Sequence, residues 1–340
     1  MSLSVSASSM TPVKTVGNRS DAAVTPSGTA IADRLTVVLL TYNCGHRLRP
    51  VLRQLLTLGV PVIAVDNAST DDTLARLREW PGITVVPLPR NIGAAGRNEG
   101  ARRARTPYIA FCDDDGWYER DGLRIAVRLL DRHPSLAVVN ARILVGEEER
   151  LDPISTEMAA SPLPEQHDIP GTVLLSFMAG AVIVRRSAFL GVGGYHPRFF
   201  IGGEEETVSY PLAAADWQLR YVPDVVMHHH PSVANAPHLR AFGMRNTLWN
   251  AWLHRPWRSA LRWTLFTLAD TPKNRDWVRG VAMALGGLPW ALVHRRPVGD
   301  ALDRSMTVLD RRRFATRRRL LNRVDPITAR RRVTDAATGP

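Results

Sequence analysis

Four short, uninterrupted apolar runs in the first third of the chain constrain its fold more than any other feature. They are LTVVLL (35–40), VPVIAV (60–65), ITVV (83–86) and YIAFC (108–112). Continuous rather than alternating apolar sequence is typical of strands covered on both faces, as in a parallel sheet. Stretches that favour helices separate the runs, at residues 49–58, 73–79 and 96–104. This βαβα order predicts an α/β fold with right-handed crossovers.

Polar residues follow each of the four predicted strands. The clusters are TYN (41–43), DNAST (66–70), RN (90–91) and DDD (113–115). Open α/β sheets bind ligands at the carboxyl ends of their strands, so four such clusters predict a ligand site there. Ser69 and Asp71 are also suited to cap a helix N-terminus. Asp66 ends a buried strand before the turn, and we expect no structural role for it.

The aspartate triplet suggests a cation. Three adjacent carboxylates cannot be packed in an interior without a compensating positive charge. At the exposed end of a strand they form a hard-oxygen site for Mg²⁺ or Mn²⁺, and a phosphate group is the usual other partner of such an ion. A turn whose aspartates only face water is the alternative.

Charge is concentrated near the C-terminus. The 340 residues carry a net charge of +12, while residues 255–333 alone hold 19 Lys and Arg against 6 Asp and Glu, a net +13. The rest of the chain is therefore close to neutral, which argues against a general nucleic-acid-binding protein. The basic extension either meets anionic lipid or is a solubilising tail. Two cysteines, Cys44 and Cys112, indicate a reducing compartment rather than a disulfide framework.

The chain divides into four predicted parts. Residues 1–33 are rich in Ser, Thr, Ala and Gly, lack the apolar core of a signal peptide, and are expected to be disordered. Residues 34–236 form the α/β domain, residues 237–310 a helical region, and residues 311–340 a basic, partly disordered tail. The apolar segment 280–293 is too short to span a bilayer and suits a buried or interfacial helix. The tryptophans of the helical region pack a helical pair or lie at a membrane interface: Trp249, Trp252, Trp257 and Trp263.

Six motifs between residues 35 and 230 carry a resemblance to a known family. They are TYN (41–43), VDNAST (65–70), RNIGAAGRNEG (90–100), DDD (113–115), GGYHPRFFIGGEEE (193–206) and YVPDVVMHHH (221–230). In this order and spacing the chain resembles family 2 glycosyltransferases of the GT-A fold, and among them bacterial rhamnosyltransferase-type members that act on cell-surface glycans. The resemblance implies a Rossmann-like, mostly parallel central sheet flanked by helices, here with a C-terminal helical extension.

The resemblance also implies residue roles. Asp115, with Asp113 and His229, would hold Mn²⁺ or Mg²⁺, although His228 and His230 adjoin His229 and a one-residue shift would change the choice. Asp66 matches the carboxylate that reads uracil or thymine. Arg97 is a candidate for diphosphate contact or a surface helix residue. The full set expected at the donor is Thr41, Tyr42, Asn43, Asp66, Asn67, Arg90, Asn91, Gly93, Arg97, Asp113 and Asp114.

An inverting transferase needs a carboxylate to take the proton from the acceptor hydroxyl. The family pattern is Glu-Asp with the Asp as base, and Glu205 matches that Asp. The extra methylene is a departure from the pattern, so Glu204 remains an alternative base. Acidic residues at a helix N-terminus are also favourable without any catalysis.

These observations together predict an inverting, divalent-metal-dependent glycosyltransferase. It would move a sugar from a UDP- or dTDP-sugar, with dTDP-rhamnose among the candidates, to a hydroxyl of a glycan or lipid-linked acceptor in cell-surface polysaccharide synthesis. We expect it in the cytoplasm, with peripheral contact to the anionic inner face of the cell membrane. A metal-dependent nucleotidyltransferase is the alternative enzyme, but the chain lacks a GxxxxGK[ST] phosphate loop. A non-catalytic, membrane-associated scaffold is the third interpretation, and the carboxylates at both the metal and the base positions argue against it.

Overall fold

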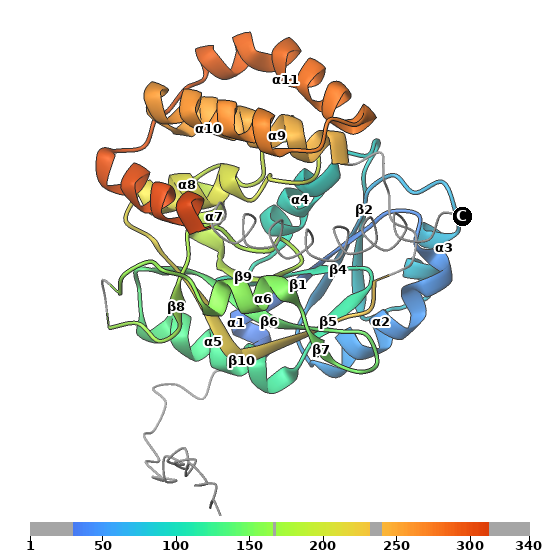
Figure 1. Cartoon of the computed structure of the whole chain (residues 1–340). Coiled ribbons are helices and arrows are strands. Elements are labelled where there is room, and N and C mark those ends of the chain that lie inside the picture. The colour runs from blue at the N-terminus through green and yellow to red at the C-terminus, as the bar shows by residue number, and fades with distance from the viewer. Residues whose placement is uncertain (1–29, 166–167, 232–239, 313–340) are drawn as a thin grey trace, which may run out of the picture.

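The computed structural model describes residues 30–165, 168–231 and 240–312 (Figure 1). The predicted basic tail from residue 313 onward and the predicted disordered segment up to residue 29 lie outside the described residues. Residues Ile31–Arg34, at the end of the segment expected to be disordered, form the short helix α1. Both cysteine thiols are buried and free.

The described strands and helices alternate through the first half of the chain. The strands are β1 (Leu35–Thr41), β2 (Val62–Asp66), β3 (Ile83–Pro87), β4 (Tyr108–Asp113), β5 (Gly116–Tyr118), β6 (Leu136–Val145), β7 (Arg150–Leu151), β8 (Thr172–Val173), β9 (Ala181–Arg185) and β10 (Gln218–His229). The helices after α1 are α2 (Gly45–Thr57), α3 (Thr73–Arg78), the 3₁₀ turn η1 (Gly93–Ala95), α4 (Gly96–Arg103), α5 (Arg120–Arg132), α6 (Pro153–Ala159), α7 (Arg186–Gly191), α8 (Glu206–Ala214), α9 (Arg240–His254), α10 (Trp257–Asp270) and α11 (Arg275–Val293).

The central sheet has the order β3-β2-β1-β4-β9-β6-β10-β5. Strands β1 to β4 are parallel, as their continuous apolar sequences predict, and β6 is parallel to β10. Strand β9 is inserted antiparallel between β4 and β6, a pairing that the sequence did not indicate. The predicted α/β architecture with a mostly parallel sheet and C-terminal helices is confirmed.

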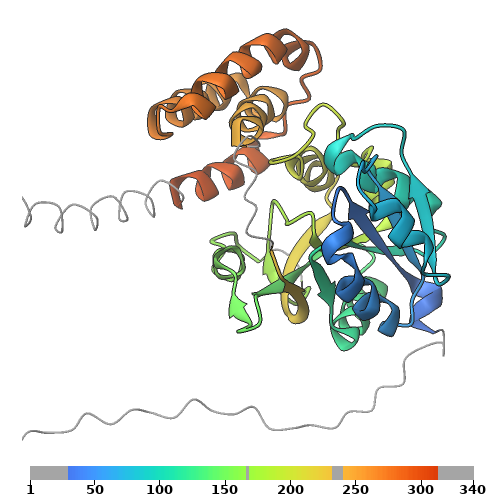
Figure 2. The ribbon, with the colours of Figure 1, turned by 90° about the vertical axis from the view of Figure 1, so that its right-hand side faces the viewer.

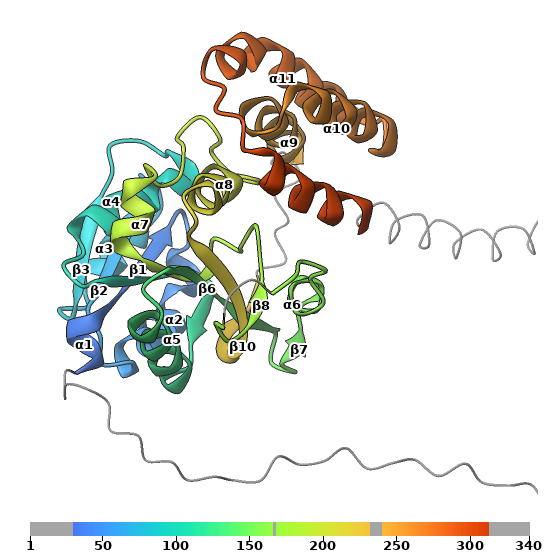
Figure 3. The same cartoon turned by 90° about the vertical axis from the view of Figure 1, so that its left-hand side faces the viewer.

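Alternating side chains of the buried strands supply a core on each face of the sheet. Val37 and Leu39 of β1 belong to the core that includes α2 and α5, whereas Val38 belongs to the core that includes α4, α7 and α8. Figure 3 shows these helices on opposite sides of the sheet. Burial on both faces explains why the strands read as unbroken apolar runs.

The C-terminal helices pack as a separate group beside the sheet (Figures 1 and 2). Helix α9 contacts α8, α10 and α11. Trp249 is buried in their core, Trp252 packs against it, and Trp263 lies over the guanidinium of Arg255. Only Trp257 of these four tryptophans is largely exposed. Among the helices of the described residues, none combines the length and apolarity that a membrane span needs.

Candidate active site

The ends of three neighbouring strands bring expected donor-site residues to one edge of the sheet. Thr41, the last residue of β1, is the register partner of Asp66, the last of β2. On the other side of β1, Leu40 pairs with Asp113, the last of β4. Because these strands are parallel, their carboxyl ends share an edge. The structure therefore brings together the polar clusters that follow them in sequence.

The buried carboxylate of Asp66 holds the turn after β2. It accepts hydrogen bonds from the backbone amide of Ser69 at 3.1 Å and from its hydroxyl at 2.5 Å, and the Thr41 hydroxyl donates to it at 3.5 Å. The expectation that Asp66 has no structural role is therefore wrong; a serine three residues later was the available signal. A carboxylate has about four acceptor positions, and these three bonds leave about one of them unused.

The first two strand-end loops are tied to each other through Asn43. Its side-chain oxygen accepts from the Thr70 backbone amide at 2.8 Å, and its backbone amide donates to the Ser69 hydroxyl at 3.0 Å. Asn43 has a φ of 48°, in the left-handed region that asparagine tolerates. Beside it, Tyr42 is 45% exposed. This leaves an aromatic ring free at the edge where a base or ribose is expected.

The third loop is braced by amide side chains. The Asn67 side chain donates to the Gly93 carbonyl at 3.0 Å, and the Asn91 side chain accepts from the Gly93 amide at 2.9 Å. Gly93 has a φ of 62°, and a Cβ there would collide with the carbonyl oxygen of Phe200. Asn67, Asn91 and Gly93 thus shape the backbone where it approaches the 198–203 loop. Arg90 is exposed.

The first two aspartates of the triplet pair with arginines from different helices. Asp113 forms an ion pair with the buried guanidinium of Arg97 on α4. Asp114 forms one with Arg47 of α2 at 2.8 Å, and burial raises the pKa of the Asp114 carboxyl. Arg97 is therefore an interior residue and not a surface one. The sequence analysis did not include Arg47 among the site residues. Its position in the helix that directly follows the TYN cluster could have indicated that it lies near the strand ends.

The third aspartate lies beside one histidine of the triplet. The Nε2 atom of His229 is 3.5 Å from Oδ1 of Asp115, and this carboxylate raises the pKa of His229. His228 and His230 instead lie against the Trp117 ring, with ring centroids 5.5 and 4.8 Å apart. The structure thus places the His229 imidazole beside an aspartate carboxylate, whereas His230 contacts Asp115 through its backbone amide.

The Asp115–His229 pair suits a divalent cation shared with a ligand. Donor atoms 3.5 Å apart can both ligate one ion at about 2.1 Å. Among the described residues, no three His, Cys, Asp or Glu side chains form a group that could hold a metal ion. Mg²⁺ in phosphate-handling sites is held by one or two protein ligands plus phosphate oxygens. The residues fit that arrangement and not a closed, all-protein site.

The two glutamates that precede α8, Glu204 and Glu205, have raised pKa values. Glu204 is only 4% exposed, and its Oε2 atom has no hydrogen-bond partner within the described part of the chain. Burial raises the pKa of Glu204 and raises that of Glu205 strongly, with the negative charge of Glu204 adding to the second effect. Carboxylates with raised pKa in a cleft are suited to accept protons near neutral pH.

Side chains of α9 hold the loop that carries these glutamates. The Asn246 side-chain amide lies 2.8 Å from the Phe199 carbonyl oxygen and 2.7 Å from that of Gly202, and the Asn250 amide donates to the Gly203 carbonyl at 2.7 Å. Asn246 is fully buried. The sequence analysis did not identify these positioning residues. Two asparagines one turn apart in a tryptophan-rich helix could have indicated that their side chains bind buried backbone groups.

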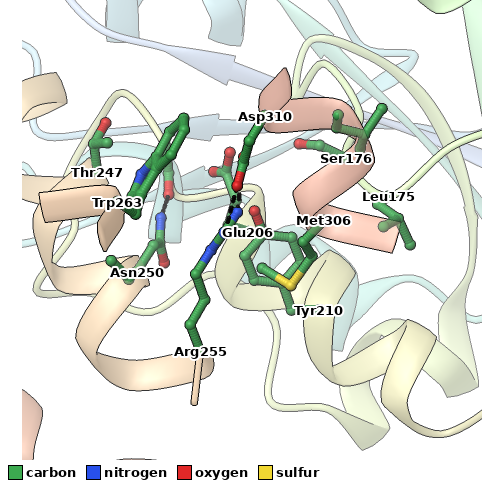
Figure 4. A pocket seen from close by; sticks show the side chains of 13 residues that line it. Leu175, Ser176, Glu206, Tyr210, Thr247, Asn250, Arg255, Trp263, Met306 and Asp310 are labelled. Atoms are coloured by element: carbon green, nitrogen blue, oxygen red, sulfur yellow. Dashed lines mark hydrogen bonds and ion pairs between the residues drawn. The ribbon is translucent and has the colours of Figure 1, made fainter. Parts of the chain in front are cut away.

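A pocket lies next to this loop, between α8, α9, α10 and the helical residues 300–312 (Figure 4). One wall carries the bidentate ion pair of Arg255 and Asp310, at 2.5 and 2.9 Å. Apolar, aromatic, hydroxyl, amide and carboxylate groups line the rest, together with Gly203 of the loop. An aromatic surface beside a few convergent polar groups suits a sugar ring. The polar and aromatic lining residues are Ser176, Glu206, Tyr210, Thr247, Asn250 and Trp263.

Comparisons with known proteins match part of the chain to one family. The profile of the family described as Glycosyl transferase family 2 matches residues 36–192. The N-acetylglucosaminyl-diphospho-decaprenol L-rhamnosyltransferase of Mycobacterium tuberculosis is 28% identical over 276 residues, covering 69% of this chain and 90% of that protein.

Two solved structures share the fold. Staphylococcus aureus TarS, residues 1–349, has a TM-score of 0.52 at 18% identity, covering 76% of this chain and 81% of that one. GalNAc-T7 with UDP, GalNAc and Mn²⁺ has a TM-score of 0.54 at 15% identity, covering 76% of this chain and 56% of that one. At these identities the likeness establishes the glycosyltransferase GT-A fold.

Proposed function

We propose that the protein is an inverting, metal-dependent glycosyltransferase of cell-surface polysaccharide synthesis, because residues 36–192 match the profile of glycosyl transferase family 2. Its donor is a UDP- or dTDP-sugar, and its acceptor is a hydroxyl of a glycan or lipid-linked glycan. dTDP-rhamnose is the first donor to test, because a relative is named for L-rhamnosyl transfer to a diphospho-decaprenol-linked sugar. We place the reaction in the cytoplasm, where two free thiols persist.

One observation carries the proposal: the aspartate triplet and the glutamate loop meet across Arg97. This buried guanidinium pairs with Asp113, and its charge also opposes the rise in the pKa of Glu204. The acidic strand end that suits a cation and a diphosphate therefore adjoins the carboxylates that suit a base. A transferase needs that adjacency, because the acceptor oxygen must attack the carbon that carries the departing diphosphate.

In the proposed reaction, Glu205 takes the proton of the acceptor hydroxyl as its oxygen attacks the anomeric carbon. The bond from that carbon to the diphosphate oxygen breaks, and the nucleoside diphosphate leaves with the bonding electrons. Asp115 and His229 would hold the cation, with Asp113 beside them. When bound, that ion stabilises the negative charge that develops on the leaving group. A single displacement inverts the anomeric configuration.

The pocket of Figure 4 provides the proposed acceptor site. It adjoins the glutamate loop through Gly203 and Glu206. Trp263 contributes an aromatic ring to its lining, and Thr247 and Asn250 offer hydrogen-bonding groups to a pyranose.

The test measures nucleoside-diphosphate release from a panel of UDP- and dTDP-sugars with Mn²⁺ or Mg²⁺. We expect metal-dependent release from one donor and a loss of about 10²–10⁴-fold in kcat for Glu205→Gln. Parallel assays of Glu204→Gln identify the base, because the smaller loss belongs to the residue that does not transfer the proton. Release of pyrophosphate would instead indicate nucleotidyl transfer. A product that keeps the donor's anomeric configuration would rule out the single displacement.

A further inference from the structure

The outward side of α11 is apolar along most of its length. Figures 1 and 2 show this helix on the outside of the C-terminal group, on the side away from the sheet. Every residue from 280 to 293 is apolar in sequence, and the exposed ones recur at helical spacing. Leu285 is 63% exposed and Val293 80%. The exposed positions are Ala282, Leu285, Gly286, Pro289, Leu292 and Val293.

The opposite side of α11 already has its partner. Trp249 of α9 donates from its indole nitrogen to the Ala284 carbonyl at 3.0 Å, and its ring stacks edge-on with Trp290 at 5.4 Å. Gly287 lies so close to the Trp249 ring that a Cβ would collide with it. The exposed residues on the outward side of α11 are therefore not part of the core of this helical group. A helix that is apolar all round is normally buried in protein or in lipid.

Cationic residues frame the apolar surface. Arg275 and Arg279 are exposed on the first turns of α11, and Arg296 is exposed just past its end. Residues 255–333 carry a net charge of +13. Apolar side chains framed by Lys or Arg are typical of helices that lie in the interface of an anionic membrane.

A second copy of the chain suits this surface less well. If α11 paired with itself in parallel, Arg275 and Arg279 would face their own copies. If it paired antiparallel, they would face Arg296. Either arrangement brings exposed cations together, whereas anionic lipid headgroups neutralise both ends at once.

We propose that the outward side of α11 docks the protein on an anionic lipid surface, with the helix lying in the plane of the membrane. Membrane docking goes beyond the proposed function, because it does not depend on which sugar donor the protein binds or on whether it transfers the sugar. It assigns the contact to Leu285, Leu292 and Val293, and not to the tryptophans of α9, whose rings pack inside the helical group. The proposed acceptor pocket is lined in part by α9, against which α11 packs, so docking would bring the pocket near a lipid-linked sugar.

The experiment is flotation of the full chain with vesicles of phosphatidylcholine alone and of phosphatidylcholine with phosphatidylglycerol. We expect binding to the anionic vesicles only, weakened by salt and reduced about ten-fold or more by Leu285→Glu. Leu151→Glu is the matched control, since Leu151 is also exposed, at 48%, but lies on β7. It should bind as the wild type does.

Three outcomes would overturn the proposal: no binding of the wild type to anionic vesicles, equal losses for the two variants, or equal binding to neutral vesicles. Light scattering after size-exclusion chromatography tests the alternative, in which a second copy of the chain covers this surface. A wild-type dimer that Leu285→Glu dissociates, without vesicle binding, would identify a subunit contact instead. Nucleoside-diphosphate release by Leu285→Glu without vesicles should match the wild type. Failure of docking is thereby distinguished from failure of the transferase proposal.

Discussion

At the scale of single residues, the site places acidic groups where charge is costly. Glu204 and Glu205 have pKa values raised by burial, so the folded chain prefers their neutral forms more than the unfolded chain does. Folding then binds protons, and stability falls as pH rises from the ordinary glutamate pKa of about 4.3 through the raised folded value. The candidate bases are therefore expected to destabilise the fold at neutral pH.

This gives a prediction for Glu205→Gln. The neutral amide removes the charge whose burial is unfavourable, so the variant should unfold at a higher temperature than the wild type at pH 8. A chain of this size gains about 2 °C for each 1 kcal/mol. The difference should shrink as pH is lowered through the raised pKa and should vanish near pH 4. Differential scanning fluorimetry across pH measures it.

Glu148→Gln provides the control, because Glu148 has a side chain that is 77% exposed. It should leave the melting temperature unchanged at every pH. A variant at Glu205 that is less stable than the wild type at pH 8 would contradict the assigned burial effect.

The partners of single side chains could not be predicted from the sequence. The aspartate triplet pointed to a polar strand end, but not to its division among Arg97, Arg47 and His229. These partners are 16, 67 and 114 residues away from their aspartates along the chain, so no local pattern could reveal them. Side-chain pairing of this kind follows from how α2, α4 and β10 pack.

At the scale of elements, local sequence predicted more. The apolar runs predicted β1 to β4 and their parallel order because burial on both faces leaves an unbroken apolar sequence. The sequence does not predict the orientation of the later strands, because β9 is equally apolar yet runs antiparallel between β4 and β6. The likeness of parallel and antiparallel buried strands in sequence explains this limit. The register of β10 then decides which histidine meets Asp115.

Helix α9 and the 198–203 loop yield a second prediction. Asn246→Ala removes the amide that caps the Phe199 and Gly202 carbonyls. Leaving such buried groups unpaired costs about 1–3 kcal/mol. We expect kcat for sugar transfer to fall about ten-fold or more, because misplacement of a base lowers the rate steeply. Donor affinity should change less than kcat, because the loop reaches the donor side through the Phe200 carbonyl, which accepts from the Ala94 amide and not from Asn246.

Turnover assays and calorimetric titration with the nucleoside diphosphate separate these two effects. Arg240→Ala, an exposed replacement at the start of the same helix, is the control. An equal loss of kcat and nucleotide affinity in Asn246→Ala would indicate general unfolding and would contradict a positioning role.

At the scale of the whole molecule, the C-terminal region adjoins the proposed site. Met306 and Val298 pack in one core with Val173 and Leu175 of the α/β domain. Trp263 and Asn250 line the pocket beside the glutamate loop. The sequence predicted helices here from composition, but not that they complete a pocket, because that depends on contacts between segments about 100 residues apart. Loss of this packing should therefore alter acceptor use before donor binding.

The ion pair of Arg255 and Asp310 tests that view. Both side chains are buried, and the pair joins the end of α9 to the helical residues 300–312. Asp310→Ala leaves the guanidinium buried without its carboxylate, which costs about 3–5 kcal/mol. We expect a lower urea midpoint of unfolding. Replacing both partners, as in Arg255→Met with Asp310→Leu, should recover most of the loss because no charge remains buried. If the double variant is no more stable than Asp310→Ala, burial of an unpaired charge is not the cause, and the last helix is held by its apolar contacts.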